Sequence, residues 1–181
     1  MTEGKFCSSL LRDLREAYPS VIAHQHWTSI PSSNARFQPR NPYDFYVVFE
    51  GRFLAVEAKQ IKGRSLPVGK YRFHQTEALL DVIKSDNGDA WYLVNIRELL
   101  VEKAPEELRE FRYGKRVLAC AVVAPFEMDA MVEQAKKAGR KSIPVEAVVE
   151  NAHAFFGRAK KGWDVEGFVN ICYSGRCCRG C

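Results

Sequence analysis

The sequence lacks any long apolar run, although hydrophobic residues make up 46% of its 181 residues. A helix that crosses a membrane needs at least about 18 consecutive apolar residues, and no stretch here approaches that length. The opening residues 1–5 also lack the apolar segment of a secretory signal. Internal repeats are absent as well. We therefore expect a cytoplasmic protein with a single domain over residues 1–170 and no membrane partner.

Histidine is scarce, and cysteine is unevenly placed. The four histidines have no spacing typical of metal ligands. Cys7 and Cys120 lie in apolar patterns and are expected to be buried thiols. The other four cysteines crowd the last ten residues, and they are Cys172, Cys177, Cys178 and Cys181. We expect a disordered tail over residues 171–181. Zinc binding by these thiols is only the alternative. Their spacing differs from the usual pattern of two paired knuckles in zinc sites.

Positive charge is concentrated in the first part of the chain. The net charge is +5, and residues 1–75 hold 11 Lys/Arg against 6 Asp/Glu, whereas residues 76–181 hold 16 of each. A basic region of this kind is typical of proteins that bind a polyanion, although ordinary surface charge would also account for it.

The apolar patterns predict helices and strands in alternation. In residues 3–17, the apolar side chains Phe6, Leu10, Leu11 and Leu14 fall on one helical face. Residues 91–96 form a continuous apolar run, as in a strand covered on both faces. Further helices are expected over residues 74–85, 105–112, 127–138 and 144–156, further strands over residues 21–27 and 117–124, and loops over residues 28–42 and 61–72. This order predicts an α/β (α+β) fold with a central mixed β-sheet flanked by helices.

Residues 44–59 read as a β-hairpin with charged residues at one end. Two apolar runs flank a turn at Glu50-Gly51, and a hairpin of this length brings Asp44 back beside Glu57. Lys59 shares a face with Glu57, since strand residues two apart point the same way. Charged side chains in a buried strand are costly unless they are paired or metal-bound.

Two carboxylates and a lysine at one sheet end suit metal-dependent cleavage of a phosphodiester. Mg²⁺ prefers oxygen ligands, which Asp44, Glu57 and the backbone carbonyl of Ala58 would supply. Lys59 would stabilise the charge that develops on the phosphoryl oxygens or orient the attacking water. The alternative is an edge hairpin with an exposed Glu/Lys pair.

The hairpin resembles the core of the PD-(D/E)xK nucleases, and in particular of RecU-type Holliday junction resolvases. The similarity runs through residues 43–59, Ser65-Leu66-Pro67, Phe73-His74-Gln75 and the segment 139–144. Residues 97–116 look like an insertion. The resemblance implies a restriction-endonuclease-like fold and a Mg²⁺ cofactor that Mn²⁺ replaces. It also implies a homodimer that resolves four-way DNA junctions by paired nicks in a bacterial or phage-infected cell, with Gln75 near the metal.

Two features depart from the resolvase pattern. The long stalk of RecU-type proteins is replaced by a short loop, which is more similar to archaeal Hjc-type resolvases. In both groups the first helix brings an acidic ligand just after a Phe, but here Phe6 is followed by Cys7. Glu3 lies four residues before Cys7 on the same helical face and would substitute. Otherwise the ligand is absent and water takes its place.

Basic residues in the two loops are candidates for contacts with DNA phosphates. They are Arg36, Arg40, Lys62, Arg64, Lys70, Arg72 and His74, with Phe37, Tyr71 and Phe73 between them as candidates for base stacking. Solvated loops are the alternative. Two other functions stay open at this point: a PD-(D/E)xK nuclease for another DNA substrate, of the repair or restriction type, and a non-catalytic DNA-binding module.

Overall fold

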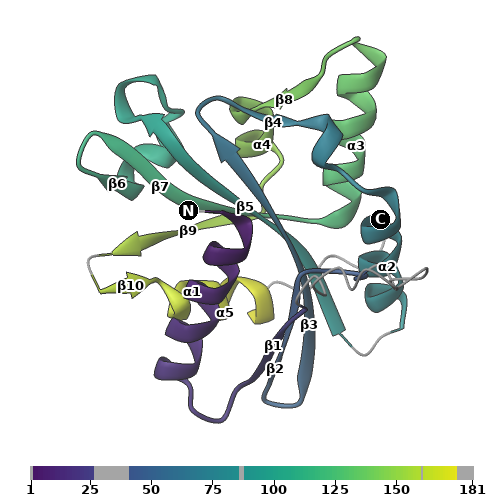
Figure 1. Ribbon diagram of the computed structural model, residues 1–181, viewed down its shortest axis with the longest axis vertical. Helices are drawn as coiled ribbons and strands as arrows, with labels where there is room; N and C mark the ends of the chain where they lie inside the picture. Colours follow the sequence, from purple (N-terminus) through teal and green to yellow (C-terminus); the bar gives the residue numbers. More distant parts are fainter. Residues whose placement is uncertain (1, 27–40, 86–87, 160, 175–181) are drawn as a thin grey trace, which may run out of the picture.

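An eight-stranded mixed sheet forms the centre of the computed structural model, which describes residues 2–26, 41–85, 88–159 and 161–174 (Figure 1). The strand order is β1-β2-β3-β5-β7-β9-β10, with β6 paired to β7. The strands are β1 (Ile22–Gln25), β2 (Phe45–Phe49), β3 (Arg52–Lys62), β4 (Ser65–Pro67), β5 (Gly88–Leu100), β6 (Arg112–Tyr113), β7 (Arg116–Val123), β8 (Ser142–Pro144), β9 (Ala154–Ala159) and β10 (Gly162–Trp163). The α-helices are α1 (Glu3–Ala17), α2 (Phe73–Lys84), α3 (Pro125–Lys137), α4 (Val145–Glu150) and α5 (Val165–Ser174), and the 3₁₀ helices are η1 (Val68–Lys70), η2 (Val101–Lys103) and η3 (Glu106–Phe111).

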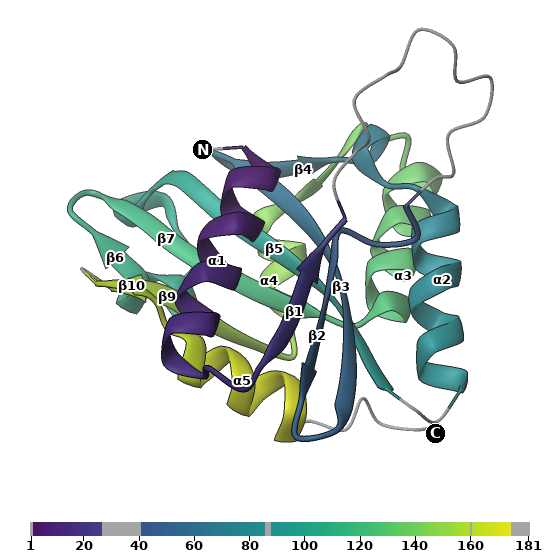
Figure 2. The ribbon, with the colours of Figure 1, turned by 60° about the horizontal axis from the view of Figure 1, so that its bottom comes forward.

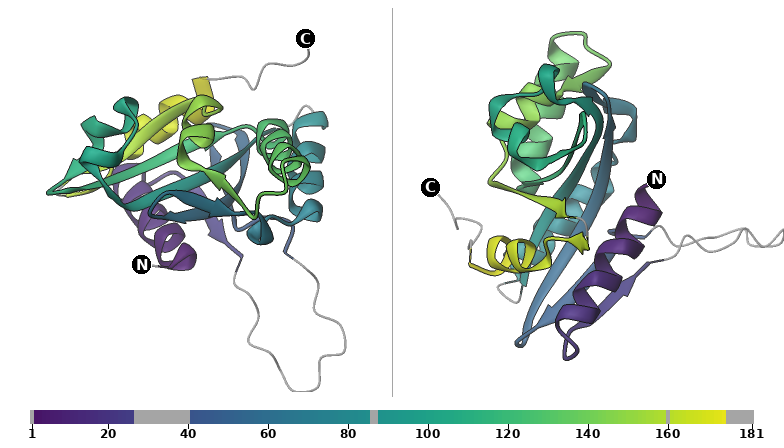
Figure 3. Two further views of the ribbon diagram at one scale, coloured as in Figure 1. Left: turned by 90° about the horizontal axis from the view of Figure 1, so that it is seen from above. Right: turned by 90° about the vertical axis from the view of Figure 1, so that its left-hand side faces the viewer.

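Helices cover both faces of the sheet, and each face has its own apolar core. Trp91 and Leu93 of β5 point to the face packed by α1 and α5, whereas Tyr92 and Val94 point to the face packed by α3 and α4. Figure 2 shows α1 and α5 on the near side of the sheet, and Figure 3 shows α2 and α3 side by side. The predicted fold class, a mixed sheet flanked by helices, is confirmed.

The hairpin of β2 and β3 forms as the sequence predicts. Glu50 and Gly51 form a two-residue turn with φ angles of 50° and 77°, which is the primed geometry that matches strand twist. Phe45 pairs with Val56, so the residue before β2, Asp44, lies beside the Glu57 region of β3. The turn therefore sets the register that brings the two carboxylates together.

A parallel pairing of β3 with β5 fixes the other side of the hairpin. Glu57 pairs with Tyr92 and Lys59 with Val94, and α2 provides the crossover connection between the two strands. Two segments of the resolvase-like pattern also meet, because Leu66 of β4 pairs with Ile143 of β8 in a separate two-stranded sheet. The expected basic loop over residues 61–72 therefore contains β4 and η1.

The C-terminal third differs from the sequence prediction. The helix expected over residues 144–156 is wrong, since α4 ends at Glu150 and residues 154–159 form β9. A further helix, α5, was not predicted. The tail does not begin at residue 171, because Cys172 lies in α5 with its side chain fully buried in the core. Cys177, Cys178 and Cys181 lie outside the described residues.

The structure also describes the two predicted buried thiols, the predicted short helix and part of the predicted loop. Cys7 and Cys120 are buried thiols as predicted. The short helix expected over residues 105–112 is the 3₁₀ helix η3, and the segment 97–116 also holds the end of β5, η2 and β6. Most of the loop predicted over residues 28–42 lies outside the described residues. Among the described helices, none is long and apolar enough to cross a membrane.

Candidate active site at the end of the hairpin

Backbone hydrogen bonds hold Asp44 at the entrance of β2. The Asp44 N–H donates to the carbonyl of Val56 at 3.0 Å, and the Asp44 carbonyl accepts the N–H of His26 at 2.8 Å. The carboxylate Oδ2 accepts the backbone N–H of Ala58 at 2.8 Å. The Asp44 side chain is thereby directed across the hairpin to the segment 57–59.

Glu57 and Lys59 form a buried ion pair on one face of β3. Their residues are 1% and 5% exposed, and Lys59 Nζ contacts Glu57 Oε1. The Lys59 amine also donates to Gln75 Oε1 at 3.1 Å and lies over the ring of Tyr92, 5.9 Å from its centroid. The exposed Glu/Lys pair considered above is therefore wrong, because this pair is enclosed by the sheet and α2.

Burial makes the negative charge on both carboxylates costly. Burial, the charge of Asp44 and to a smaller extent that of Glu3 raise the pKa of Glu57 to about 8, although Lys59 opposes them. Burial also raises the pKa of Asp44 above its ordinary value, against the effects of the Ala58 N–H and Lys59. Such displaced pKa values are typical of functional sites.

One oxygen of Glu57 is left without a partner. Glu57 Oε2 is buried and accepts no hydrogen bond. A buried carboxylate oxygen in this condition is rare and calls for an explanation. A divalent cation shared with Asp44 would satisfy the oxygen and offset the charge of both carboxylates. The residues present therefore fit a cation site, with Asp44 and Glu57 as its carboxylate ligands.

A third acidic ligand is not assembled at this centre. Among the described residues, no group of three or more His, Cys, Asp or Glu side chains is placed to hold one metal ion. Glu3 lies in the first turn of α1 and pairs with Lys70 of η1 at 2.9 Å. Its charge nonetheless raises the pKa of Asp44 and of Glu57, so Glu3 acts on the site electrostatically.

Cys7 lies closer to the centre than the sequence suggests. Its thiol is 1% exposed, and burial raises its pKa, with further contributions from Asp44, Glu57 and Glu3. The thiol is therefore neutral, and it packs in the apolar core on the α1 face of the sheet. Only its position after Phe6 hints at this location.

Tyr92 and Thr76 form a polar pair that sequence reasoning missed. Their hydroxyl groups are 2.6 Å apart and both residues are buried. The pair lies between α2 and β5, next to Lys59, and so holds Gln75 and the lysine at a fixed separation. Tyr92 stands in a continuous apolar run, where nothing in the sequence distinguishes it from a core residue.

The predicted phosphate-binding residues have different surroundings. Lys62 ends β3 and is exposed, and His74 is partly exposed in the first turn of α2 beside Gln75. Arg72 is exposed and donates to the carbonyl of Gly69 at 2.9 Å. Arg36 and Arg40 lie outside the described residues, as does Phe37.

The other two described basic residues already have acidic partners. Arg64 pairs with Glu146 of α4 at 3.1 Å, and Lys70 pairs with Glu3. Of the aromatic candidates, Phe73 is 62% exposed and accessible to a base. Tyr71 is only partly exposed, and its hydroxyl donates to Asp129 of α3 at 2.7 Å, which joins the segment between η1 and α2 to α3.

The fold and this site define a mixed α/β protein with a buried centre of two carboxylates and a lysine. No protein-family model matches the sequence, and no curated protein sequence matches it. Among solved structures, the chain is similar to Hjc, a Holliday junction resolvase from the archaeal hyperthermophile Archaeoglobus fulgidus, with a TM-score of 0.35 and 20% identity. The match covers 51% of this chain and 66% of that chain, just under two thirds of the resolvase. At this level of similarity the site geometry has to carry the functional argument.

Proposed function

We propose that the protein is a Mg²⁺-dependent endodeoxyribonuclease with its active site at Asp44, Glu57 and Lys59. The observation that carries the proposal is the buried Glu57 Oε2 without a partner, beside a second carboxylate and a lysine. In a purely structural ion pair this unsatisfied buried oxygen would only lower stability, whereas a bound cation would satisfy it.

The residues divide the work of cleavage between them. Asp44 and Glu57 would hold the cation, with the Ala58 carbonyl as a third oxygen ligand. When bound, Mg²⁺, with Mn²⁺ as a substitute, would neutralise charge at the phosphate and lower the pKa of a bound water. Lys59 would exchange its bond to Glu57 for one to a phosphate oxygen. Gln75 holds the Lys59 amine and keeps it aimed at the site.

The substrate we propose is a four-way DNA junction, cut by paired nicks from a homodimer. The support is the resemblance of residues 43–59, 65–67, 73–75 and 139–144 to junction resolvases, two segments of which meet as β4 and β8. The excess positive charge of residues 1–75 favours a polyanionic substrate. Lys62, Arg72 and His74 are the described candidates for phosphate contacts, with Arg64 and Lys70 if they release their acidic partners.

A non-catalytic DNA-binding module is the second candidate. The observation that favours it is the first helix, where Cys7 is neutral and Glu3 pairs with Lys70. In that case the carboxylates would be retained without supporting cleavage.

The test uses the substitution Asp44→Asn. Asparagine keeps an oxygen that accepts the Ala58 N–H, so the fold should persist, but the ligand charge is lost. We expect the cleavage rate to fall at least about 1,000-fold, which corresponds to the several kcal/mol that a metal ion supplies. Binding to a four-way junction in EDTA should stay unchanged. The matched control is Asp81→Asn, an exposed carboxylate on α2.

The assay compares a four-way junction, a three-way junction, a flap and a linear duplex, each with and without Mg²⁺. Cutting of the linear duplex at the same rate as the junction would replace the junction assignment by another nuclease substrate. Normal cutting by Asp44→Asn would overturn the active site. Absence of cleavage on every DNA, with binding retained, would favour the non-catalytic module.

A further inference from the structure

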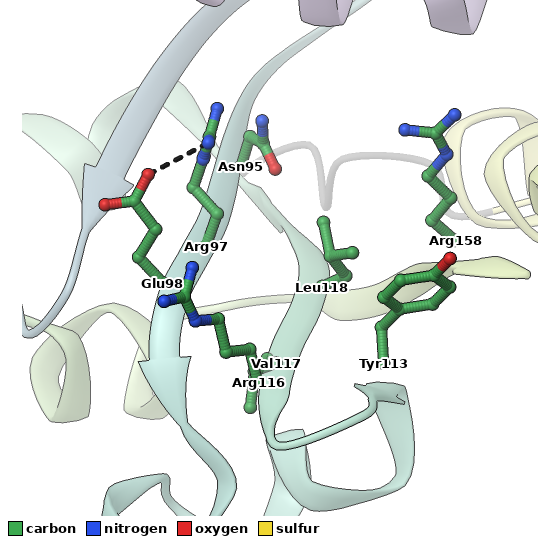
Figure 4. Close-up of a pocket in the computed structure, with 8 residues that line it drawn as sticks. All are labelled: Asn95, Arg97, Glu98, Tyr113, Arg116, Val117, Leu118 and Arg158. Carbon is green, nitrogen blue, oxygen red and sulfur yellow. Dashed lines mark hydrogen bonds and ion pairs between the residues drawn. The ribbon is translucent and has the colours of Figure 1, made fainter. Parts of the chain in front are cut away.

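A hollow lies further along β5 than the carboxylates and on the opposite face of the sheet. It has a volume of about 250 Å³ and is lined from β5, β6, β7 and β9 (Figure 4). Its lining residues are Asn95, Arg97, Glu98, Tyr113, Arg116, Val117, Leu118 and Arg158. Ligand pockets for drug-sized molecules start at about 300 Å³, so this hollow suits a smaller unit.

Asn95 is a buried amide without any hydrogen-bond partner. The residue is 1% exposed, and neither Oδ1 nor Nδ2 is hydrogen-bonded. By strand alternation it points to the same face as Trp91 and Leu93, opposite to the face of Tyr92 and Glu57. On that face it contributes to the wall of the hollow. A buried amide with both groups unsatisfied is costly, and a ligand in the hollow would satisfy it.

The hollow carries unpaired positive charge. Arg97 pairs with Glu98 at 2.9 Å, as the dashed line in Figure 4 shows. Within the described ranges, neither Arg116 nor Arg158 has an acidic partner, so the lining residues have an excess of two positive charges. Lys62 pairs with Arg97 in the parallel register and extends the charge on the same face. An anionic group is therefore favoured.

An aromatic side chain stands at the rim. Tyr113 is 59% exposed and lies across the hollow from Asn95, close to Arg158 (Figure 4). Leu118 supplies apolar surface between them. Exposed aromatic rings beside arginines are typical of sites on which single-stranded bases stack.

The chemistry of Asn95 separates a nucleotide from a simple anion. Phosphate or sulfate offers only acceptors, so it would leave the Asn95 oxygen unsatisfied. A nucleobase edge presents a donor beside an acceptor, and an asparagine amide pairs with both, as with adenine N6 and N7. The arginines would take the attached phosphate.

We propose that this hollow binds one unpaired nucleotide of a DNA strand, with its base on Asn95 and Tyr113 and its phosphate on Arg116 and Arg158. It is a second DNA contact, on the face opposite to Glu57. It shares with the proposed function the assumption that DNA is the partner, and it requires neither the metal nor cleavage. An unpaired nucleotide occurs where strands exchange or fray, which fits a protein that binds branched DNA.

The test measures binding of a short adenine-rich single-stranded oligonucleotide by fluorescence anisotropy in EDTA. Asn95→Leu preserves side-chain size and removes both polar groups, so we expect affinity to fall about tenfold. We expect its Tm to stay the same or rise, because an unsatisfied buried amide is lost. An abasic oligonucleotide should bind wild type and Asn95→Leu equally. A fall in Tm with unchanged affinity would make Asn95 structural and overturn the proposal.

The arginines are tested with Arg116→Gln/Arg158→Gln against the control Lys137→Gln/Arg140→Gln, which removes two exposed charges near the C-terminus of α3. The first pair should weaken binding about tenfold. It should also reduce the slope of log affinity against log salt by about 0.7, as for one phosphate contact on a single strand. If both double substitutions weakened binding equally, general surface charge and not the hollow would account for binding, and the proposal would be overturned.

Free nucleotide is the other source of the same chemistry. The proposal expects deoxyadenosine monophosphate to compete only at concentrations far above the oligonucleotide. Competition at lower concentration would assign the hollow to free nucleotides and overturn the strand contact. These binding measurements are made in EDTA, so a negative result would not argue against cleavage at Asp44. Likewise, absence of wild-type cleavage in Mg²⁺ would not argue against nucleotide binding in the hollow.

Discussion

At the scale of single residues, Glu57 is the carboxyl group whose pKa burial raises to about 8. It is almost fully buried, stands beside a second carboxylate and forms an ion pair with Lys59. Burying a charge with incomplete pairing destabilises the fold. On the proposed function, the site would lose stability and gain the capacity to bind a cation, which is a common relation between function and stability.

This trade predicts a specific pH dependence of stability in the absence of metal. Folded Glu57 keeps its proton up to about pH 8, whereas the unfolded chain releases it near its ordinary pKa of 4.5. The folded state thus binds more protons in this interval, and the free energy of unfolding falls as pH rises through it. We expect wild type to lose on the order of 3 kcal/mol between pH 5 and about pH 8.5. Glu57→Gln should lose clearly less.

Thermal unfolding in EDTA across this pH range measures the difference. Asp81→Asn serves as the control and should follow wild type. Saturating Mg²⁺ should raise the Tm of wild type at pH 8, because the ion favours ionised Glu57, and should leave Glu57→Gln unchanged. Parallel pH curves for wild type and Glu57→Gln would contradict the assignment of the raised pKa to this carboxylate.

At the scale of secondary-structure elements, α1 contributes to the site through its first two turns. Glu3 joins α1 to η1 through Lys70, and Cys7 packs in the apolar core on the α1 face of the sheet. Both members of the Glu3–Lys70 pair are partly exposed, and an exposed pair stabilises a protein by at most about 1 kcal/mol. The pair can therefore open at little cost. Glu3 would then affect cation binding either through its charge or as a direct ligand.

We predict that Glu3 acts through its charge. Glu3→Gln should weaken Mg²⁺ binding about threefold, because one nearby negative charge is lost through partly solvated space. Glu3→Asp retains the charge on a shorter side chain and should bind Mg²⁺ like wild type. The Mg²⁺ affinity of each variant, measured by calorimetry or from Tm as a function of Mg²⁺ concentration, separates a charge effect from direct ligation. A loss of tenfold or more in both variants would identify Glu3 as a direct ligand.

The same scale shows what the sequence could predict. The β2–β3 hairpin was predictable because alternating apolar residues and the Glu50-Gly51 turn specify it locally. The helix expected over residues 144–156 was wrong because its apolar residues suit a helix followed by a strand equally well, and pairing of β9 with β7 decides the outcome. Helix α5 was not predicted for a similar reason. Its apolar residues are explained only by their packing against α1 and β5.

The site was predictable where it depends on the hairpin and unpredictable where it depends on packing. Spacing alone placed Asp44 beside Glu57, and strand alternation placed Lys59 with them. The bonds of Lys59 to Gln75 and of Tyr71 to Asp129 join residues from elements whose packing no local pattern specifies. The hollow at Asn95 arises from four strands, and a lone asparagine within an apolar run gave no signal of it.

At the scale of the whole molecule, the long strands β3 and β5 carry both the carboxylate centre and the hollow at Asn95. The carboxylates lie on the face of Tyr92, and Asn95 lies further along β5 on the opposite face. The ends of the described chain are also joined, since Asp13 of α1 accepts the N–H of Trp163 of β10 at 2.9 Å and Ser9 accepts the indole N–H at 2.9 Å. The sheet thus holds both sites rigidly in one frame.

If each proposed centre cuts one strand, resolution of a junction requires two copies. We predict that mixing wild type with excess Asp44→Asn converts the product of a cruciform plasmid from linear to nicked circular DNA. Mixed dimers would bind the junction with one working centre, nick one strand and leave the opposite strand intact. Mixing with Asp81→Asn should still yield linear plasmid, since both centres then work. Agarose electrophoresis of the products measures the ratio. If linear product merely declined in proportion to the wild-type fraction, without nicked circles, the two cuts would not come from paired subunits, and a single chain would have to reposition its one centre between strands.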